Sequence, residues 1–225
     1  MATRLSIVVP VLDEARCIEA TLAALASMRA RGHEVIVVDG GSADDTVARA
    51  AAAADTVMAS ARGRARQMNA GASRAGGDVL LFLHADTLLP EGADVSVLDA
   101  VAAGAGWGRF DVRITGGPPM LRIVAAMMNL RSRWSGIATG DQALFVQRRL
   151  FEQVGGFPDQ PLMEDIELSR RLRALSAPAC LRRRVLTSGR RWESRGMWRT
   201  VFLMWRLRWR YWRGESPETL AQAYR

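Results

Sequence analysis

The sequence LLFLHADTLLP, residues 80–90, contains a short apolar run that ends abruptly in His84-Ala85-Asp86. Four to eight apolar residues bounded by a polar turn are typical of a buried β-strand. A carboxylate just beyond such a strand lies where open α/β sheets bind their ligands, at the carboxyl ends of the strands. This segment therefore predicts an α/β fold with a ligand site near Asp86.

Two earlier apolar runs end in the same way. Residues 5–11 run into Asp13-Glu14, and residues 34–38 run into Asp39. Together with Asp86, these residues place acidic groups at the ends of three predicted parallel strands. Such an arrangement predicts a site for a metal-bound, phosphate-bearing ligand.

Strand-like and helix-like segments alternate along the first ninety residues. Strands separated by helices of this length indicate βαβ units and a mostly parallel sheet. The predicted strands are residues 5–11, 34–38, 56–59, 78–83, 107–114 and 143–146, and the predicted helices are residues 15–31, 44–54, 63–75, 120–130 and 164–175.

The bulk composition is that of one domain, or of one domain with an appendage. At 225 residues and 49% hydrophobic residues, the chain can form one domain with a large core. We expect neither a secretory leader nor a membrane span, because the sequence has no h-region and no run near about 18 apolar residues. Cys17 and Cys180 lack metal-ligand spacing, so a reduced state and a cytoplasmic location are expected.

The positive charge is concentrated near the C-terminus. All 31 basic residues are arginine, which excludes lysine Schiff-base chemistry and the lysine of a P-loop. The net charge is +8, and residues 182–225 hold twelve of the arginines against three acidic residues. The rest of the chain is therefore almost neutral.

Asp39 opens the sequence DGGSADDT, residues 39–46, between a predicted strand and a predicted helix. We expect Ser42 to cap that helix and Asp45 to close a capping box. A carboxylate at a strand end is costly to desolvate unless something binds it, so Asp39 is a candidate ligand for a base or a ribose hydroxyl. The GxGxxG fingerprint of dinucleotide-binding folds is absent.

Three further segments carry candidate chemistry. Residues 62–66, Arg-Gly-Arg-Ala-Arg, lead into a predicted helix, where N–H groups and arginines favour phosphate; a solvated basic face is the alternative. His84 and Asp86 lie two residues apart on extended backbone and point the same way, so both could face one ion or ribose. Glu164-Asp165 can stabilise a first helical turn, or supply a general base, because paired carboxylates raise the pKa of one member.

These segments occur in the order found in family-2 glycosyltransferases of the GT-A fold, which the chain resembles over nearly its whole length. It is most similar to a short bacterial subgroup whose metal motif reads His-Ala-Asp instead of Asp-x-Asp. The matching segments are IVVPVLDEA (7–15), VVDGGSADDT (37–46), GRARQMNAG (63–71), GGDVLLFLHADT (76–87), TGDQALFV (139–146), GGFP (155–158) and MEDIELSRRL (163–172).

The resemblance implies a GT-A-like three-layer α/β/α sandwich with a mostly parallel (mixed) sheet and a C-terminal helical appendage. It implies a hexosyltransferase in which Asp165 is the base for inverting transfer and Asp86 holds a divalent metal, Mg²⁺ or Mn²⁺. The residues implied to bind the donor nucleotide are Pro10, Asp13, Glu14, Asp39, Arg62, Arg66 and His84. Those implied to shape the acceptor and donor-sugar pocket are Gly140, Asp141, Gln142, Glu164, Arg191 and Trp192.

The C-terminal segment, residues 191–225, is predicted to be an amphipathic helical unit beside a domain of residues 1–190. Five of the seven Trp lie within residues 192–212. The apolar face either packs against the domain or lies in a membrane interface, where Trp is favoured and Arg meets anionic lipid. We therefore expect peripheral contact with the inner face of the plasma membrane through residues 191–213, and a lipid-linked or amphiphilic acceptor. The predicted Arg stripe comprises Arg195, Arg199, Arg206, Arg210 and Arg213.

Two other functions are weighed against this interpretation. A nucleotidyltransferase also uses strand-end acids and a metal, but it normally has a Gly-rich basic loop after the first strand, where residues 11–14 are acidic. A nucleic-acid-binding protein would use Arg and Trp together. We expect no nucleic-acid partner, because the charge is confined to one segment and the strand-end carboxylates would repel a phosphate backbone.

Overall fold

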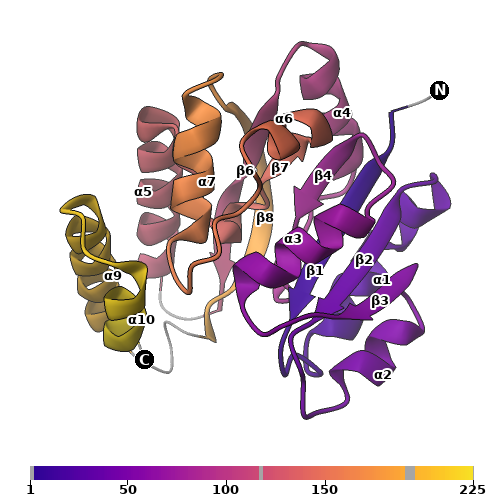
Figure 1. Ribbon diagram of the computed structural model, residues 1–225, viewed down its shortest axis with the longest axis horizontal. Helices are drawn as coiled ribbons and strands as arrows, with labels where there is room; N and C mark the ends of the chain where they lie inside the picture. Colours follow the sequence, from indigo (N-terminus) through magenta and orange to yellow (C-terminus); the bar gives the residue numbers. More distant parts are fainter. Residues whose placement is uncertain (1–2, 117–118, 191–195, 225) are drawn as a thin grey trace.

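The computed structural model describes residues 3–116, 119–190 and 196–224. Eight strands form one mixed sheet in the order β3-β2-β1-β4-β7-β6-β8-β5 (Figure 1). The strands are β1 (Leu5–Val11), β2 (Glu34–Asp39), β3 (Thr56–Ala59), β4 (Val79–Phe82), β5 (Thr87–Leu88), β6 (Trp107–Thr115), β7 (Phe145–Gln147) and β8 (Ala179–Ser188). The helices are α1 (Ile18–Ala30), α2 (Thr46–Ala51), α3 (Arg64–Arg74), α4 (Ala93–Ala102), α5 (Met120–Ser135), the 3₁₀ turn η1 (Gly140–Gln142), α6 (Arg148–Gln153), α7 (Glu164–Arg173), α9 (Met197–Trp212) and α10 (Pro217–Tyr224).

The direction of the strands sets which loops share an edge of the sheet. β1 pairs in parallel with β2 and β4, and β6 pairs in parallel with β8. β7 is antiparallel to both β4 and β6. The carboxyl ends of β1, β2, β4, β6 and β8 therefore lie at one edge, and β7 begins at that same edge. The prediction of a mostly parallel, mixed sheet is confirmed.

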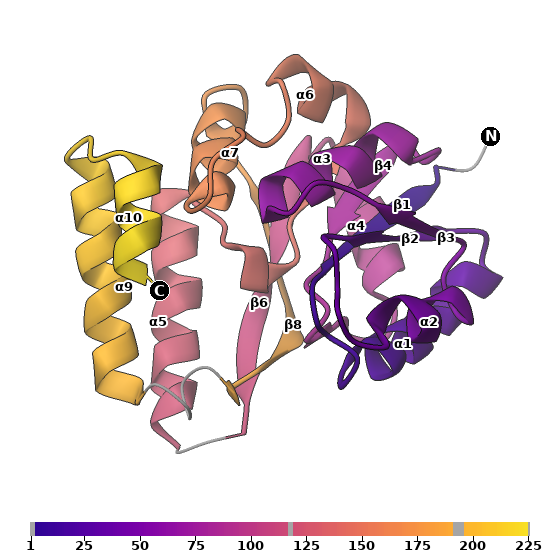
Figure 2. The same cartoon turned by 60° about the horizontal axis from the view of Figure 1, so that its bottom comes forward.

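Both faces of the sheet are covered, which explains the nearly continuous apolar runs of the central strands. Ile7 and Val9 of β1 pack in one core with residues of α1, α4 and α5. Val8, which points to the opposite face, packs with residues of α3, α6 and α7. Figure 2 shows α3 on one side of β1–β3 and α1 and α2 on the other. The predicted three-layer α/β/α arrangement is therefore confirmed.

The contact between α3 and the sheet depends on Gly71. A Cβ at this position would overlap the side chains of Val8 and Val38. Because interiors are packed at crystal density, this close approach holds α3 against β1 and β2. The first turn of α3 is thereby fixed relative to the strand ends.

The last two helices pack side by side next to α5 and α7 (Figures 1 and 2). Leu207 of α9 and Leu220 of α10 are fully buried in a cluster with Met163, which directly precedes α7. Part of the apolar face of α9 thus packs against the rest of the protein, as one of the two interpretations expects. The boundary at residue 190 stays a prediction. Within the described residues, no helix has both the length and the hydropathy needed to cross a bilayer.

Several elements differ from the sequence predictions. The capping box at Ser42 and Asp45 is wrong: α2 begins at Thr46, and Asp44 accepts the Thr46 N–H at 3.0 Å instead. Ser42 is not available as a cap, because both its N–H and its hydroxyl bind Asp39. The predictions also omit α4, α6 and the strands β5 and β8.

Candidate functional site

The ends of β1 and β2 are joined by a network of short polar contacts. The Asp13 carboxylate accepts the Ala43 N–H at 2.8 Å, and the Asp13 N–H donates to the Ser42 hydroxyl at 2.9 Å. Asp39 accepts the N–H groups of Gly41 at 3.0 Å and Ser42 at 3.1 Å. The structure thus brings Asp13 and Asp39 into one loop cluster, as the donor-nucleotide prediction requires.

Asp39 is only 7% exposed, but its carboxylate is well satisfied by this loop. The Ser42 hydroxyl donates to it at 2.5 Å in addition to the two backbone N–H groups. The desolvation argument for a ligand at Asp39 therefore loses its force. A role in holding the loop that follows β2 accounts for the carboxylate by itself, and the ligand role stays a prediction.

Arg190, which is distant in sequence from both strands, lies near acidic residues that follow β1 and β4. Its Nη2 lies 3.1 Å from Glu14 Oε2 and 3.8 Å from Asp86 Oδ2. Arg190 directly follows the end region of β8, whose Ser188 N–H donates to the Asp86 carbonyl oxygen at 3.2 Å. The predicted Arg191 and Trp192 lie outside the described residues, so their roles stay predictions.

Asp86 is the strand-end carboxylate that the sequence predicts to hold a metal. Its side chain is 28% exposed. Residues 3–116, 119–190 and 196–224 contain no group of three or more His, Cys, Asp or Glu side chains arranged to hold a metal. Mg²⁺ commonly takes only one or two protein carboxylates and completes its shell with substrate phosphates and water. Asp86 therefore fits a divalent ion in that mode, with a diphosphate as the other ligand.

His84 and Asp165 meet across the turn η1. His84 Nδ1 lies 3.3 Å from Asp141 Oδ1. The His84 ring covers Gly140, where a Cβ would overlap it. On the other side, the Gly140 N–H donates to Asp165 Oδ2 at 2.8 Å. The Gly140 backbone thus contacts both His84, in the loop after β4, and the first turn of α7.

The turn η1 is itself held by a capping box. The Thr139 N–H donates to the side-chain oxygen of Gln142 at 3.2 Å, and Gln142 is fully buried. Gln142 therefore stabilises the turn from the protein interior. Gly140 and Asp141 form the surface that the turn presents.

Glu164 is buried beside Asp165 and is balanced by an arginine. Arg64, the first residue of α3, places Nη1 3.3 Å from Glu164 Oε1. Burial, followed by the charge of Asp165, raises the pKa of Glu164. Burial opposes the ionisation of Arg64, but the charges of Glu164, Asp165 and Asp141 raise the pKa of Arg64 above its ordinary value. Arg64 therefore stays cationic in the middle of this acidic group.

The other predicted donor residues lie at varying distances from this group. Pro10 is half-buried in β1. Arg66 points to a surface ion pair in which its Nε lies 2.8 Å from Asp159 Oδ1. Arg62 is exposed in the loop before α3. Their roles in binding a diphosphate stay predictions.

Left-handed backbone marks the same edge. In the described part of the chain, the residues other than glycine with positive φ are Asp13 (54°), Ala143 (46°) and Met163 (67°). Asp13 follows β1, Ala143 follows η1, and Met163 precedes Glu164. Such conformations are uncommon for these residue types and cluster at functional sites. All three lie next to the candidate site, which supports its location independently of charge.

Two participants are absent from the sequence predictions. Arg64 pairs with Glu164, whereas its neighbours Arg62 and Arg66 were the predicted arginines. The helical register could have indicated this difference. Ala65, Met68 and Ala72 form the buried face of α3, and this face limits the directions in which Arg64 and Arg66 can point. Arg190 directly precedes Arg191 and Trp192, the two residues that the resemblance implied.

Solved structures of glycosyltransferases share this fold. TarS of S. aureus in complex with UDP-GlcNAc is 16% identical, with a TM-score of 0.65 over 82% of this chain and 58% of that chain. Glucosyl-3-phosphoglycerate synthase of Mycobacterium tuberculosis, in complex with Mn²⁺, UDP and phosphoglyceric acid, is 20% identical, with a TM-score of 0.59 over 81% of this chain and 69% of that chain. The mannosyltransferase PcManGT of Pyrobaculum calidifontis, in complex with GDP-Man and Mn²⁺, is 21% identical, with a TM-score of 0.66 over 100% of this chain and 69% of that chain.

These similarities define the class of fold, that of GT-A glycosyltransferases. The chain spans less than two thirds of the TarS chains that it matches. Residues 6–145 match the sequence profile described as glycosyl transferase family 2. The chain therefore belongs to glycosyl transferase family 2, and the predicted resemblance is confirmed. No curated protein matches the sequence.

Proposed function

We propose that this protein transfers a hexose from a nucleoside diphosphate sugar to an acceptor hydroxyl, with inversion at the anomeric carbon. The observation that carries the proposal is the position of Asp165. The Gly140 N–H donates to its Oδ2 at 2.8 Å, and the ring of His84, two residues before Asp86, packs against Gly140. A carboxylate from α7 is thereby placed near the strand-end acids.

Asp165 would act as the general base. Its oxygens accept the N–H groups of Gly140 and Ile166, and each carboxylate oxygen retains a second lone pair. One of these would take the proton of the acceptor hydroxyl. The hydroxyl oxygen would then form a bond to the anomeric carbon as the bond to the diphosphate breaks on the opposite face. Arg64 pairs with Glu164 and offsets its negative charge. Asp165 would therefore accept the proton beside a neighbouring carboxylate whose charge is already balanced.

The donor would occupy the loops after β1, β2 and β4. TarS, the synthase and the mannosyltransferase were crystallised with UDP-GlcNAc, UDP or GDP-Man, which supports a nucleotide-sugar donor. Asp86 would hold a divalent ion, Mg²⁺ or Mn²⁺. When bound, the ion would neutralise charge that develops on the leaving diphosphate.

A screen of nucleotide sugars by thermal shift, with and without Mn²⁺, tests the donor and metal assignments together. A UDP- or GDP-sugar should raise the Tm of the wild-type protein, and Mn²⁺ should increase that rise. Asp86→Ala should lose the Mn²⁺-dependent part, whereas Asp99→Ala, an exposed control on α4, should keep it. Failure of every nucleotide sugar to stabilise the wild type would refute the proposed function. A wild-type response of Asp86→Ala would refute the metal assignment alone.

The cytoplasmic location and the peripheral membrane contact belong to the same proposal. Trp198, Trp205, Trp209 and Trp212 of α9 are between 58% and 81% exposed, as a membrane-facing helix requires. Of the predicted Arg stripe, Arg210 is occupied by an ion pair with Glu215, while Arg199, Arg206 and Arg213 are exposed; Arg195 lies outside the described residues.

Co-sedimentation with liposomes tests this contact. Binding should require anionic lipid and weaken with salt, because exposed charges are screened. Replacing Arg199, Arg206 and Arg213 by Gln should reduce it. Equal binding to neutral and anionic liposomes, or none to either at low salt, would contradict the membrane assignment.

A further inference from the structure

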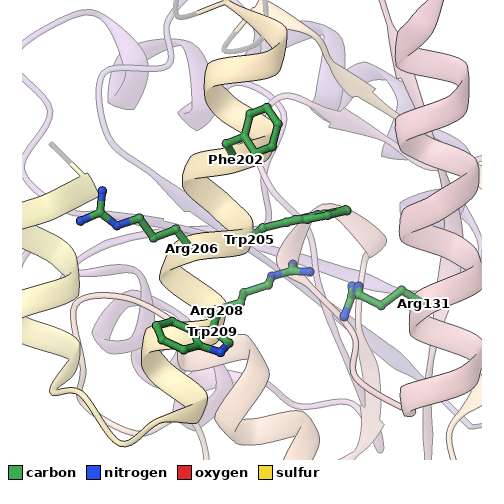
Figure 3. Close-up of a pocket in the computed structure, with 6 residues that line it drawn as sticks. All are labelled: Arg131, Phe202, Trp205, Arg206, Arg208 and Trp209. Atoms are coloured by element: carbon green, nitrogen blue, oxygen red, sulfur yellow. The ribbon is translucent and has the colours of Figure 1, made fainter.

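A cavity of about 580 Å³ lies between α5 and α9, apart from the strand-end loops. Arg131 of α5 lines one side of it. Five residues of α9 line the other, and they are Phe202, Trp205, Arg206, Arg208 and Trp209. Figure 3 shows the guanidinium groups of Arg131 and Arg208 pointing toward each other across the space between the two helices. The cavity is therefore lined only by cationic and aromatic side chains.

The two arginines have donors that the protein does not use. Nε and Nη2 of Arg131 and Nε of Arg208 are buried and have no hydrogen-bond partner among the described residues. Arg131 donates from Nη1 to the Ile137 carbonyl oxygen at 3.3 Å. Neither arginine forms an ion pair within 4.0 Å with an acid of the described residues, in contrast to the pairs that Arg109 and Arg133 form with Asp111. Buried donors without acceptors are costly, and the cost of burying two like charges adds to it.

The electrostatics agree with this geometry. Burial, followed by the charge of Arg208, lowers the pKa of Arg131 to about 10. Burial also lowers the pKa of Arg208. An anion between the two guanidinium groups would remove their repulsion and accept the unused N–H groups. The negative charge of Asp165 raises the pKa of both arginines and so partly opposes the effect of burial. The cavity is therefore close enough to the proposed base for the charges to interact.

The walls of the cavity indicate that the ligand is amphiphilic. Phe202, Trp205 and Trp209 are 64%, 58% and 58% exposed, although they are large and apolar. With Trp198 and Trp212 they recur every three or four residues and form one face of α9. On α5, a second exposed apolar series follows the same spacing, and it comprises Ile123, Met127, Leu130 and Trp134. A small hydrophilic anion would leave these rings in water, whereas an apolar chain would cover them.

We propose that the α5–α9 cavity binds the phosphate group of an amphiphilic acceptor, whose apolar chain lies along the aromatic residues of α9 and whose hydroxyl reaches Asp165. The charge selects phosphate over carboxylate, because a phosphate ester carries up to two negative charges and three acceptor oxygens, which match two guanidinium groups. This inference rests on the proposed function, since it names the class of acceptor. It differs from simple membrane contact, because Arg131 and Arg208 act from within the cavity, and of the Arg stripe only Arg206 lines it.

Binding of dodecyl phosphate below its micelle concentration tests the inference without any sugar transfer. Trp205 and Trp209 line the cavity, so a change in tryptophan fluorescence reports occupancy, and calorimetry gives the affinity. Dodecyl maltoside supplies the chain without the charge, and inorganic phosphate supplies the charge without the chain. Dodecyl phosphate should bind at least about tenfold more tightly than either probe, because a charge-assisted hydrogen bond alone is worth about tenfold or more.

Arg131→Gln and Arg208→Gln should each weaken dodecyl phosphate binding by about tenfold or more. Arg199→Gln, exposed on the same helix but outside the cavity, is the matched control and should change it by less than about twofold. Without ligand, Arg131→Gln and Arg208→Gln should raise Tm, because each removes a buried, unpaired charge. A higher Tm would show that a variant that no longer binds dodecyl phosphate is still folded.

Equal affinity for dodecyl phosphate and dodecyl maltoside would overturn the inference. So would binding that Arg131→Gln and Arg208→Gln leave unchanged. Binding to anionic vesicles without binding to soluble dodecyl phosphate would assign the arginines to a membrane surface and would also overturn it. If these outcomes occur while nucleotide sugars still raise Tm, the proposed transfer reaction stands and only the acceptor class is wrong.

Discussion

Asp165→Asn separates the chemical role of this residue from its structural role. The native carboxylate accepts the Gly140 N–H at 2.8 Å and the Ile166 N–H at 2.7 Å. The asparagine side chain keeps one carbonyl oxygen, which can retain the bond to Gly140, while its amide cannot accept the second. Loss of one such bond costs about 0.5–1.5 kcal/mol of the free energy of unfolding. The variant should therefore fold.

The effect on turnover should be much larger. Removal of a positioned general base lowers the rate by about 10²–10⁴-fold, which corresponds to about 3–5 kcal/mol in the activation barrier. Release of nucleoside diphosphate at saturating donor and acceptor measures kcat, and thermal shift with the donor checks that donor binding is unchanged. Asp159→Asn, in the exposed ion pair with Arg66, is the control and should retain activity. Normal turnover of Asp165→Asn together with an inactive Asp141→Asn would show that the base is Asp141.

Three further substitutions follow from the described contacts. Asp111→Asn should lower the free energy of unfolding by about 3–5 kcal/mol, because it leaves the fully buried Arg109 unpaired; a loss below about 1 kcal/mol in urea denaturation would contradict this. Gly140→Ala should reduce kcat by about tenfold or more with little change in Tm, because the new Cβ would displace the His84 ring and the adjacent N–H; wild-type kcat would show that the turn tolerates the shift. Burial raises the pKa of Glu164 above its ordinary value of 4.5, so its contribution to stability is present below that value and is lost as pH rises through the native pKa. Glu164→Gln should therefore gain Tm relative to wild type as pH rises above 4.5, and a difference that does not change with pH would contradict the raised pKa of Glu164.

The parts of the fold that follow local apolar pattern are predictable from sequence. β1, β2 and β4 are buried on both faces, so their apolar runs stand out and the acids after them mark the ligand edge. β8 is different, because residues 182–184 are three exposed arginines in the middle of a strand. Its pairing with β6 supplies the strand conformation, and that contact joins segments about seventy residues apart. Local propensity carries no information about such a partner.

The same reasoning explains which site residues are predictable. Asp13, Asp39 and Asp86 follow parallel strands, so their shared edge can be inferred from chain direction alone. Gly140 and Asp141 reach that edge because they precede an antiparallel strand, and the direction of β7 is set by its neighbours. The choice of Arg64 as the partner of Glu164 depends on how α3 is rotated against the sheet. That rotation is a property of the packed core.

The pairing of β5 with β8 governs when the edge of the sheet around Asp86 can form during synthesis. Thr87 lies opposite Thr187, and Ser188 donates to the Asp86 carbonyl oxygen at 3.2 Å. The intervening hundred residues take about 5–20 s to translate at ordinary rates, whereas a hairpin closes in microseconds. The β1–β2–β3–β4 unit can therefore assemble on the ribosome well before Asp86 acquires its backbone partner. A nascent chain that stops short of β8 would leave β6 as an unpaired edge strand, which makes the residues from 179 onward a determinant of folding yield.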